Sequence, residues 1–198
     1  MLRTLTVCLF LAASAVPVSA QVLWDSPPLV SHVAPAGVSL FLLSPHGGDL
    51  GGLITFRHEA GPVGLGYRLA ISDEDASDGI AVSGGVDISG FLSRAVEGSE
   101  IDVMWWSGAG VGIGEEAVVS VPVGALVGWS GQGGDVILSP YAGGHVALDV
   151  STIDADNVHF GGSVDIGLDV VLPSGWLVRF GGSIGDRDAL ALGVRIAT

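Results

Sequence analysis

The feature that most constrains the fold is an alternation, with a period of two, between apolar residues and small or polar ones. From Val158 to Leu172, one set of alternate positions reads Val, Phe, Gly, Val, Ile, Leu, Val, Leu, and the other reads His, Gly, Ser, Asp, Gly, Asp, Val. Similar splits occur in 80–92, 176–184 and 190–196. Because strand side chains point alternately to two faces, each run predicts a strand with one oily face and one polar or small face.

Turn residues divide the chain into ten such strands. Links such as Glu59-Ala60-Gly61-Pro62 and Pro173-Ser174-Gly175 supply the Gly and Pro that hairpins need. Neighbours in sequence should therefore be antiparallel neighbours in space. We expect strands at 37–45, 50–59, 62–72, 79–92, 99–114, 117–130, 135–149, 157–171, 175–185 and 188–197.

The first 20 residues have the features of a secretory signal peptide. A short positive start (Met1-Leu2-Arg3) precedes an apolar core over 4–16 and a small-residue cleavage site, Val18-Ser19-Ala20. Cys8, the one cysteine, lies inside this segment, so disulfides cannot stabilise the mature chain. We divide the chain into a signal peptide (1–20), an extended proline-containing lead-in (21–36) and a β-barrel domain (37–198).

Composition excludes several classes of protein. The chain is 48% hydrophobic with a mean hydropathy of +0.61, which a disordered acidic tail would not have. Its seven positive residues are all arginine, set against 21 acids for a net charge of −14, and they form no basic cluster, so nucleic acid is excluded as a partner. The longest later apolar stretch, 117–129, is interrupted by Ser120, Pro122 and Gly124 and is too short for a transmembrane helix.

Two architectures can use ten amphipathic strands, namely a soluble barrel with the oily face inside or a membrane barrel with that face toward lipid. A water-facing sheet surface usually carries long polar side chains, whereas the polar face here is mostly Gly, Ala and Ser. Small residues suit a narrow lumen, and about ten alternating residues match a tilted membrane strand. The prediction is an all-β fold, a closed antiparallel up-and-down transmembrane barrel of 8–10 strands.

Charges on the expected inner face have both signs, and we expect them to pair across the lumen. One interpretation is structural, with these pairs plugging the barrel, and the alternative is a role in selectivity or transport. The expected lumen charge cluster consists of Arg68, Asp87, Asp102, Asp165, Asp169, Arg179 and Arg195.

The strand ends predict two different rims. An even strand number puts both termini at one rim, which we take as periplasmic. Aromatic residues near that rim should form a partial interfacial girdle: Phe91, Trp105, Trp129 and Trp176.

Acidic residues gather at the other rim, with Arg187 as the counter-charge. They either solubilise the loops or capture cations such as Ca²⁺, although Asp73-Glu74-Asp75 and Asp154-Ala155-Asp156 match no EF-hand loop and no metal site is predicted.

Together, the signal peptide, the repeated alternation and a final strand at the C-terminus resemble the small outer-membrane β-barrel proteins of Gram-negative bacteria, the OmpA-like and OmpX-like barrels. The resemblance covers residues 36–198 and implies an outer-membrane location and insertion by the outer-membrane assembly machinery. Such barrels commonly finish with an aromatic residue, whereas this chain finishes Arg195-Ile196-Ala197-Thr198. Because the resemblance is a pattern and not a motif, it implies no catalytic residue.

Some barrels of this kind act on lipid acyl chains, so His159, Ser163 and His145 are candidate catalytic groups. His159 and Ser163 lie four residues apart on one strand face, about 13 Å, too far for a direct hydrogen bond. His145 on the adjacent strand can reach either, with Asp165 to orient it. Polar filling of the lumen explains the same residues, so no enzyme activity and no cofactor are predicted.

The sequence therefore predicts a monomeric barrel in the bacterial outer membrane, structural or narrowly porin-like, with the lipid bilayer as its partner. The alternative is a secreted or periplasmic soluble β-barrel that binds an apolar ligand inside, as lipocalins do.

Overall fold

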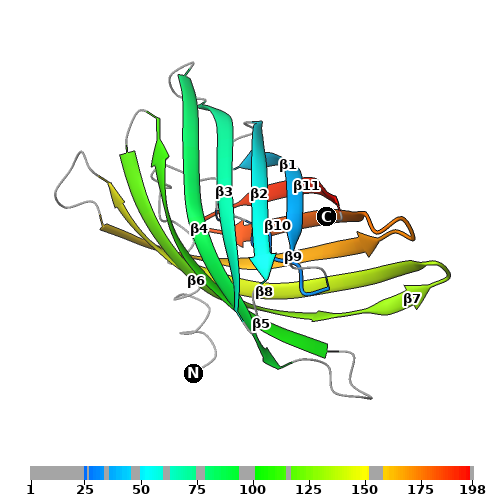
Figure 1. Cartoon of the computed structure of the whole chain (residues 1–198). Coiled ribbons are helices and arrows are strands. Elements are labelled where there is room, and N and C mark those ends of the chain that lie inside the picture. Colours follow the sequence, from blue (N-terminus) through cyan, green and yellow to red (C-terminus); the bar gives the residue numbers. More distant parts are fainter. Residues whose placement is uncertain are drawn as a thin grey trace, which may run out of the picture.

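Figure 1 shows the whole chain as a computed structural model, in which one curved sheet winds around a central axis. The structure describes residue 25 and residues 27–33, 36–45, 50–59, 63–74, 79–93, 101–114, 117–151 and 158–196. The expected signal peptide, residues 1–20, lies outside the described residues.

Every expected strand is present, with ends shifted by a few residues at most. The turn residues that cut the alternating pattern also end the strands, because Gly and Pro leave the ladder there. The strands are β1 (Gly37–Pro45), β2 (Gly51–Glu59), β3 (Val63–Glu74), β4 (Gly79–Ser93), β5 (Ile101–Ile113), β6 (Ala117–Trp129), β7 (Gly131–Gly133), β8 (Val136–Ser151), β9 (Val158–Val171), β10 (Leu177–Gly185) and β11 (Ala189–Ile196).

Antiparallel pairing between sequence neighbours closes the sheet into a barrel. The first and last strands meet, with Val38 opposite Ile196, and β6 pairs with β8. The short β7 continues β6 past Ser130 along the same neighbour, so the wall has ten strands. The expected closed, antiparallel, up-and-down barrel is confirmed, at the upper end of the predicted range of strand number.

The described residues contain strands, turns and bends. Among them, no helix is long and apolar enough to cross a membrane.

Burial alternates along each strand and separates the two faces of the wall. On β3, Leu65, Leu69 and Ile71 are exposed on the outside, whereas Arg68 and Ser72 are buried on the inside. Closure accounts for this arrangement, since a period-two strand must send every second side chain into the enclosed volume.

Two rims are defined by the register. The terminal rim is where β1 begins and β11 ends, and it also carries the β9–β10 turn at 172–176. The opposite rim carries the β10–β11 turn, residues 186–188. The lumen is the space inside the wall between these rims.

The lumen also holds part of the N-terminal segment. Residues 25 and 27–33, which we call the strap, are almost all buried, and two apolar clusters tie them to the wall. Leu29 joins Phe41, Leu43 and Leu53 in one cluster. Val30 joins the other, which contains Met104, Trp106 and Leu126, with Phe91 packed against it.

Candidate functional site: the polar lumen

The strap runs along the lumen from one end to the other. Asp25 is fully buried and forms an ion pair with Arg187, in the turn at the opposite rim. Ser31 donates a hydrogen bond of 2.5 Å to Asp169, near the end of β9 at the terminal rim. Both strand termini lie at one rim, as the even strand number requires, but Asp25 has passed through the barrel to the other rim. The part of the expected lead-in that the structure describes therefore lies inside the wall.

Arg187 connects the strap to the wall at the opposite rim. Its guanidinium pairs with Asp25 and with Asp149 of β8, and it donates to the hydroxyl of Ser120 on β6 at 3.1 Å. Burial raises the pKa of the Asp25 carboxyl, and the neighbouring Arg187 opposes that rise. The sequence suggested Arg187 as the counter-charge of the acidic rim, and it pairs with Asp149 there while its side chain is buried.

A second group of charges, the arginine cluster, lies toward the terminal rim and consists of Arg57, Arg68, Arg179 and Arg195. Arg68 donates through Nε to Asp87 at 2.6 Å, and Arg57 pairs with the other oxygen of Asp87. Arg57 also donates to the hydroxyl of Ser89 at 2.7 Å.

Arg179 of this cluster binds Asp169 and Tyr141. It donates through Nε and Nη2 to the two oxygens of Asp169 at 2.5 and 2.6 Å, a bidentate geometry that fixes both groups. Its guanidinium also lies 4.9 Å from the ring centroid of Tyr141, close enough for a cation–π contact.

His145 anchors a third polar group in mid-lumen. Its Nδ1 lies 2.8 Å from Oδ2 of Asp165, and Ser183 donates to the other oxygen of that carboxyl at 2.5 Å. The imidazole also packs on Trp106, with ring centroids 5.5 Å apart. Gly124 makes this contact possible, because a Cβ there would lie 2.7 Å from both the His145 Cβ and the Trp106 Nε1.

His32 lies near the end of the strap and packs against the C-terminal end of β6, at the terminal rim. Its imidazole lies directly over Gly128, where a Cβ would overlap the ring. Burial lowers the pKa of His32, whereas the carboxylates of Asp169 and Asp102 act in the opposite direction.

The residues of the expected lumen charge cluster differ in their contacts, and only some of them form ion pairs with one another. Arg68, Asp87, Asp169 and Arg179 form two buried ion pairs inside the wall. Asp165 contacts His145 and Ser183 and not an arginine, Arg195 donates to the backbone carbonyl of Ala36, and Asp102 lies on β5 opposite Gly128, near His32.

The expected aromatic girdle divides between the two faces. Trp129 and Trp176 are exposed at the terminal rim, and Trp105 is partly exposed on β5. Phe91 instead packs inward against the cluster of Met104 and Trp106. It shares its parity with Asp87 and Ser89, so the pleat turns it into the lumen despite its position near the strand end.

Two acids of the opposite rim are used to build its turn. Asp186 accepts a hydrogen bond from the backbone N–H of Gly162 at 2.8 Å, and Asp188 accepts one from Gly185 at 2.6 Å. Among the residues that the structure describes, no group of three or more His, Cys, Asp or Glu side chains is placed to hold a metal ion.

The residues considered for catalysis have structural partners. His145 and Ser163 are opposite each other on β8 and β9, but the Ser163 hydroxyl accepts a hydrogen bond from the backbone N–H of Arg187 at 3.1 Å. His159 lies near the opposite rim and is exposed. We assign no reaction to this arrangement.

Sequence reasoning missed several residues of the lumen network. Arg57 shares its strand face with Leu53 and Thr55, so parity alone could have placed it inside. Asp25 gave no such signal, because it precedes the first strand and its partner Arg187 is 162 residues away.

Comparison with known proteins gives no family assignment. The chain matches no protein-family model and no curated protein. The class that the structure defines is a closed ten-stranded β-barrel with a charged, strapped lumen.

Proposed function

We propose that this chain is an outer-membrane β-barrel protein whose outer wall contacts lipid and whose lumen is closed by the strap and by buried ion pairs. The observation that carries the proposal is the distribution of large apolar side chains on the outside. They come from every long strand of the wall, with exposed fractions such as 57% for Leu69, 66% for Phe160 and 67% for Ile184. Monomeric soluble proteins rarely expose a continuous apolar surface of this kind.

The dimensions of the wall support the same proposal. Its long strands have 8 to 16 residues, and about 9–11 tilted residues cross the hydrocarbon core of a bilayer. Closure between β1 and β11 leaves no open edge, which hydrocarbon would not tolerate.

The interior supports a structural role over a freely conducting pore. The strap is buried inside the wall, and its contacts with Asp169 and Arg187 hold it near the two rims. A cavity among Ser39, Thr55, Arg57 and Arg179 has a volume of about 20 Å³, room for about one water molecule.

A lipocalin-like carrier would need an apolar interior large enough for its ligand. The inner surface instead carries buried Arg68, Asp87 and Asp165. A wide apolar groove of about 670 Å³ is lined largely by outward side chains of β1 and β9–β11, including Leu42, Phe180 and Leu192, which places it at the outer wall. An acyl chain of the bilayer is the natural occupant of such a surface.

The direct test is fractionation of cells that express the chain, followed by gel electrophoresis of boiled and unboiled protein. The expected result is an outer-membrane fraction with a heat-dependent mobility shift, since closed membrane barrels resist unfolding by cold detergent. Recovery as a soluble monomer with no mobility shift would contradict the proposal.

Planar-bilayer recording of the purified protein separates the closed barrel from a narrow pore. We expect no steady single-channel current from the intact chain. A chain lacking residues 21–33 should conduct, because the strap is the main obstruction along the lumen axis. A stable current from the intact chain would instead favour the narrow pore.

A further inference from the structure

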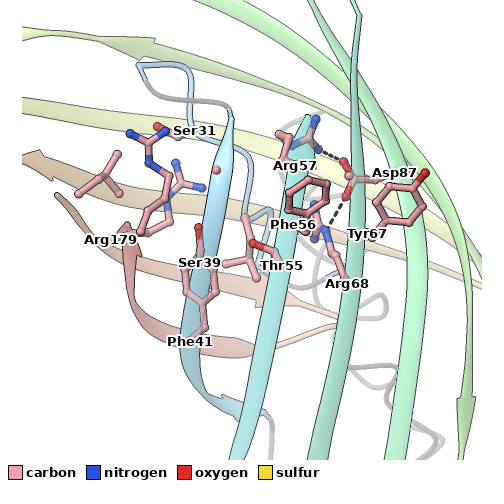
Figure 2. A pocket seen from close by; sticks show the side chains of 15 residues that line it. Ser31, Ser39, Phe41, Thr55, Phe56, Arg57, Tyr67, Arg68, Asp87 and Arg179 are labelled. Atoms are coloured by element: carbon pink, nitrogen blue, oxygen red, sulfur yellow. Dashed lines mark hydrogen bonds and ion pairs between the residues drawn. The ribbon is translucent and has the colours of Figure 1, made fainter. Parts of the chain in front are cut away.

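The arginine cluster surrounds a small cavity inside the barrel. Figure 2 shows Arg57 and Arg68 directed at Asp87 on one side, with Arg179 on the other and the hydroxyls of Ser39 and Thr55 between them. Arg195 of β11 and Ser31 of the strap also line the cavity. The volume of about 20 Å³ suits one particle the size of a water molecule or a monatomic ion.

The charge of this lining is strongly positive. Four of the seven arginines in the chain reach the cavity, whereas Asp87 is the one carboxylate among its described lining residues. Asp169 lies behind Arg179 and binds it through both oxygens, and Asp102 lies beside His32, away from the cavity. This concentration of positive charge stands in a chain whose net charge is −14.

An unused hydrogen-bond donor of Arg179 also lies beside this cavity. Arg179 is 1% exposed, and its Nη1 has no hydrogen-bond partner among the described residues. A buried guanidinium donor without an acceptor costs free energy, and an anion in the adjacent cavity would supply that acceptor.

We propose that this cavity is a binding site for one small inorganic anion, of the size of chloride. The ion would accept a hydrogen bond from Arg179 Nη1 and from the Ser39 or Thr55 hydroxyl, and the guanidiniums of Arg57, Arg68 and Arg195 would surround it. Larger oxyanions such as sulfate exceed the space. Because Leu29 and Ser31 close one side, the site forms only when the strap is in place. It follows from the lumen alone and does not depend on whether the outer wall meets lipid.

The test uses the full chain, folded in zwitterionic detergent, with sodium chloride replaced by sodium gluconate at constant ionic strength. Gluconate is too large for the cavity, so general screening stays the same while the specific ion is removed. We expect the melting temperature to rise by several degrees as chloride goes from 1 to 100 mM, and bromide to substitute for chloride. Crystals grown in bromide should show one anomalous peak within hydrogen-bond distance of Arg179 Nη1.

Two matched variants locate the effect. Arg195→Gln removes a cation from the lining and should weaken the apparent chloride affinity at least tenfold. Ser183→Ala removes a buried hydrogen bond to Asp165, a contact that involves neither the strap nor the cavity lining, and should lower the melting temperature while leaving its chloride dependence intact. If Arg195→Gln fails to fold, the bromide peak and the anion series of the unmodified chain still decide the matter. Equal melting temperatures in chloride and gluconate, with no bromide peak, would overturn the proposal even for a chain that inserts into membranes.

Discussion

The two faces of the barrel wall are built by the same strands and have opposite character. On the outer face, Leu69, Val121 and Phe160 stand exposed. On the inner face, Arg179 and Asp169 are almost completely buried and bound to each other. A soluble protein hides its apolar residues and hydrates its charges, so this inverted arrangement is the one that the proposed lipid-facing wall requires.

The inner face should respond most strongly to the loss of half an ion pair. Asp169→Asn or Arg179→Gln alone should lower the free energy of unfolding by about 3–5 kcal/mol, because each leaves a buried group without its charged partner. The double variant Asp169→Leu with Arg179→Met should be less destabilised than either. Urea unfolding of barrels in vesicles, followed by gel mobility, measures all three. A double variant with the summed loss of both singles would show that the pair is not coupled.

An arginine placed on the outer face should destabilise the barrel more at the middle of the wall than near a rim. Leu69→Arg, at the middle of β3, should destabilise the inserted barrel by about 2–4 kcal/mol, as expected near a bilayer midplane. The matched control Ile80→Arg lies near the opposite rim and should cost about 1 kcal/mol or less. The same urea titration in vesicles compares them. Equal and negligible effects at both positions would mean that water, and not hydrocarbon, surrounds the wall.

Small residues on the inner face should be harder to replace than those on the outer face. Gly124→Ala should destabilise by about 1–3 kcal/mol, because the new methyl group would press on His145 and Trp106. Gly52→Ala is the control, since the structure shows no atom within 4 Å of its added Cβ. Thermal melting in detergent resolves the difference. If both substitutions shifted the melting temperature alike, the inner packing described around His145 would be wrong.

The smallest expected effect is a pH dependence of strap docking. Burial lowers the pKa of His32, so its neutral form is preferred in the folded lumen. The contribution is fully present above the ordinary histidine value of about 6.5 and is lost as pH falls through the lowered folded value. Asp102 and Asp169 limit the effect by favouring the charged ring, and Arg179 adds to it.

Chymotrypsin cleavage after Trp24 at pH 7.5 and pH 5, corrected for the pH dependence of the protease with a model peptide, monitors release of the strap. Cleavage should increase at pH 5, and the increase should be larger in the native chain than in His32→Gln, where Asp25 is still able to titrate. An equal pH response in both chains would assign the titration to a group other than His32.

Alternation was sufficient to predict the barrel because it is a local property. The expected strand at 79–92 is observed as Gly79–Ser93, and parity placed Asp87 and Arg68 on one face, where they bind each other. Phe91 shows that a position near a strand end does not by itself predict an interfacial side chain. The alternation of side chains along β4 directs Phe91 into the lumen.

The strap was beyond such reasoning. Its contacts, Asp25 with Arg187 and Ser31 with Asp169, join residues 162 and 138 positions apart, and no periodic pattern in 21–36 forecasts them. An extended, proline-containing segment has no periodic apolar face that would predict its burial. Its docking inside the barrel depends on the shape of the lumen, which forms only in the folded wall. The same holds for the cavity at the arginine cluster, which exists because six strands and the strap converge on it.

The most direct test of the central claim, that the outer wall faces hydrocarbon, is quenching of a fluorescent label at Leu69→Cys in a Cys8→Ser chain reconstituted in vesicles. A label at Gln132→Cys, in the exposed β7–β8 hairpin, serves as the reference. Nitroxide on lipid acyl chains should quench the Leu69 label strongly and the Gln132 label weakly, and aqueous iodide should do the reverse. A Leu69 label that iodide quenches as well as it quenches Gln132, with no response to acyl-chain nitroxide, would contradict the account.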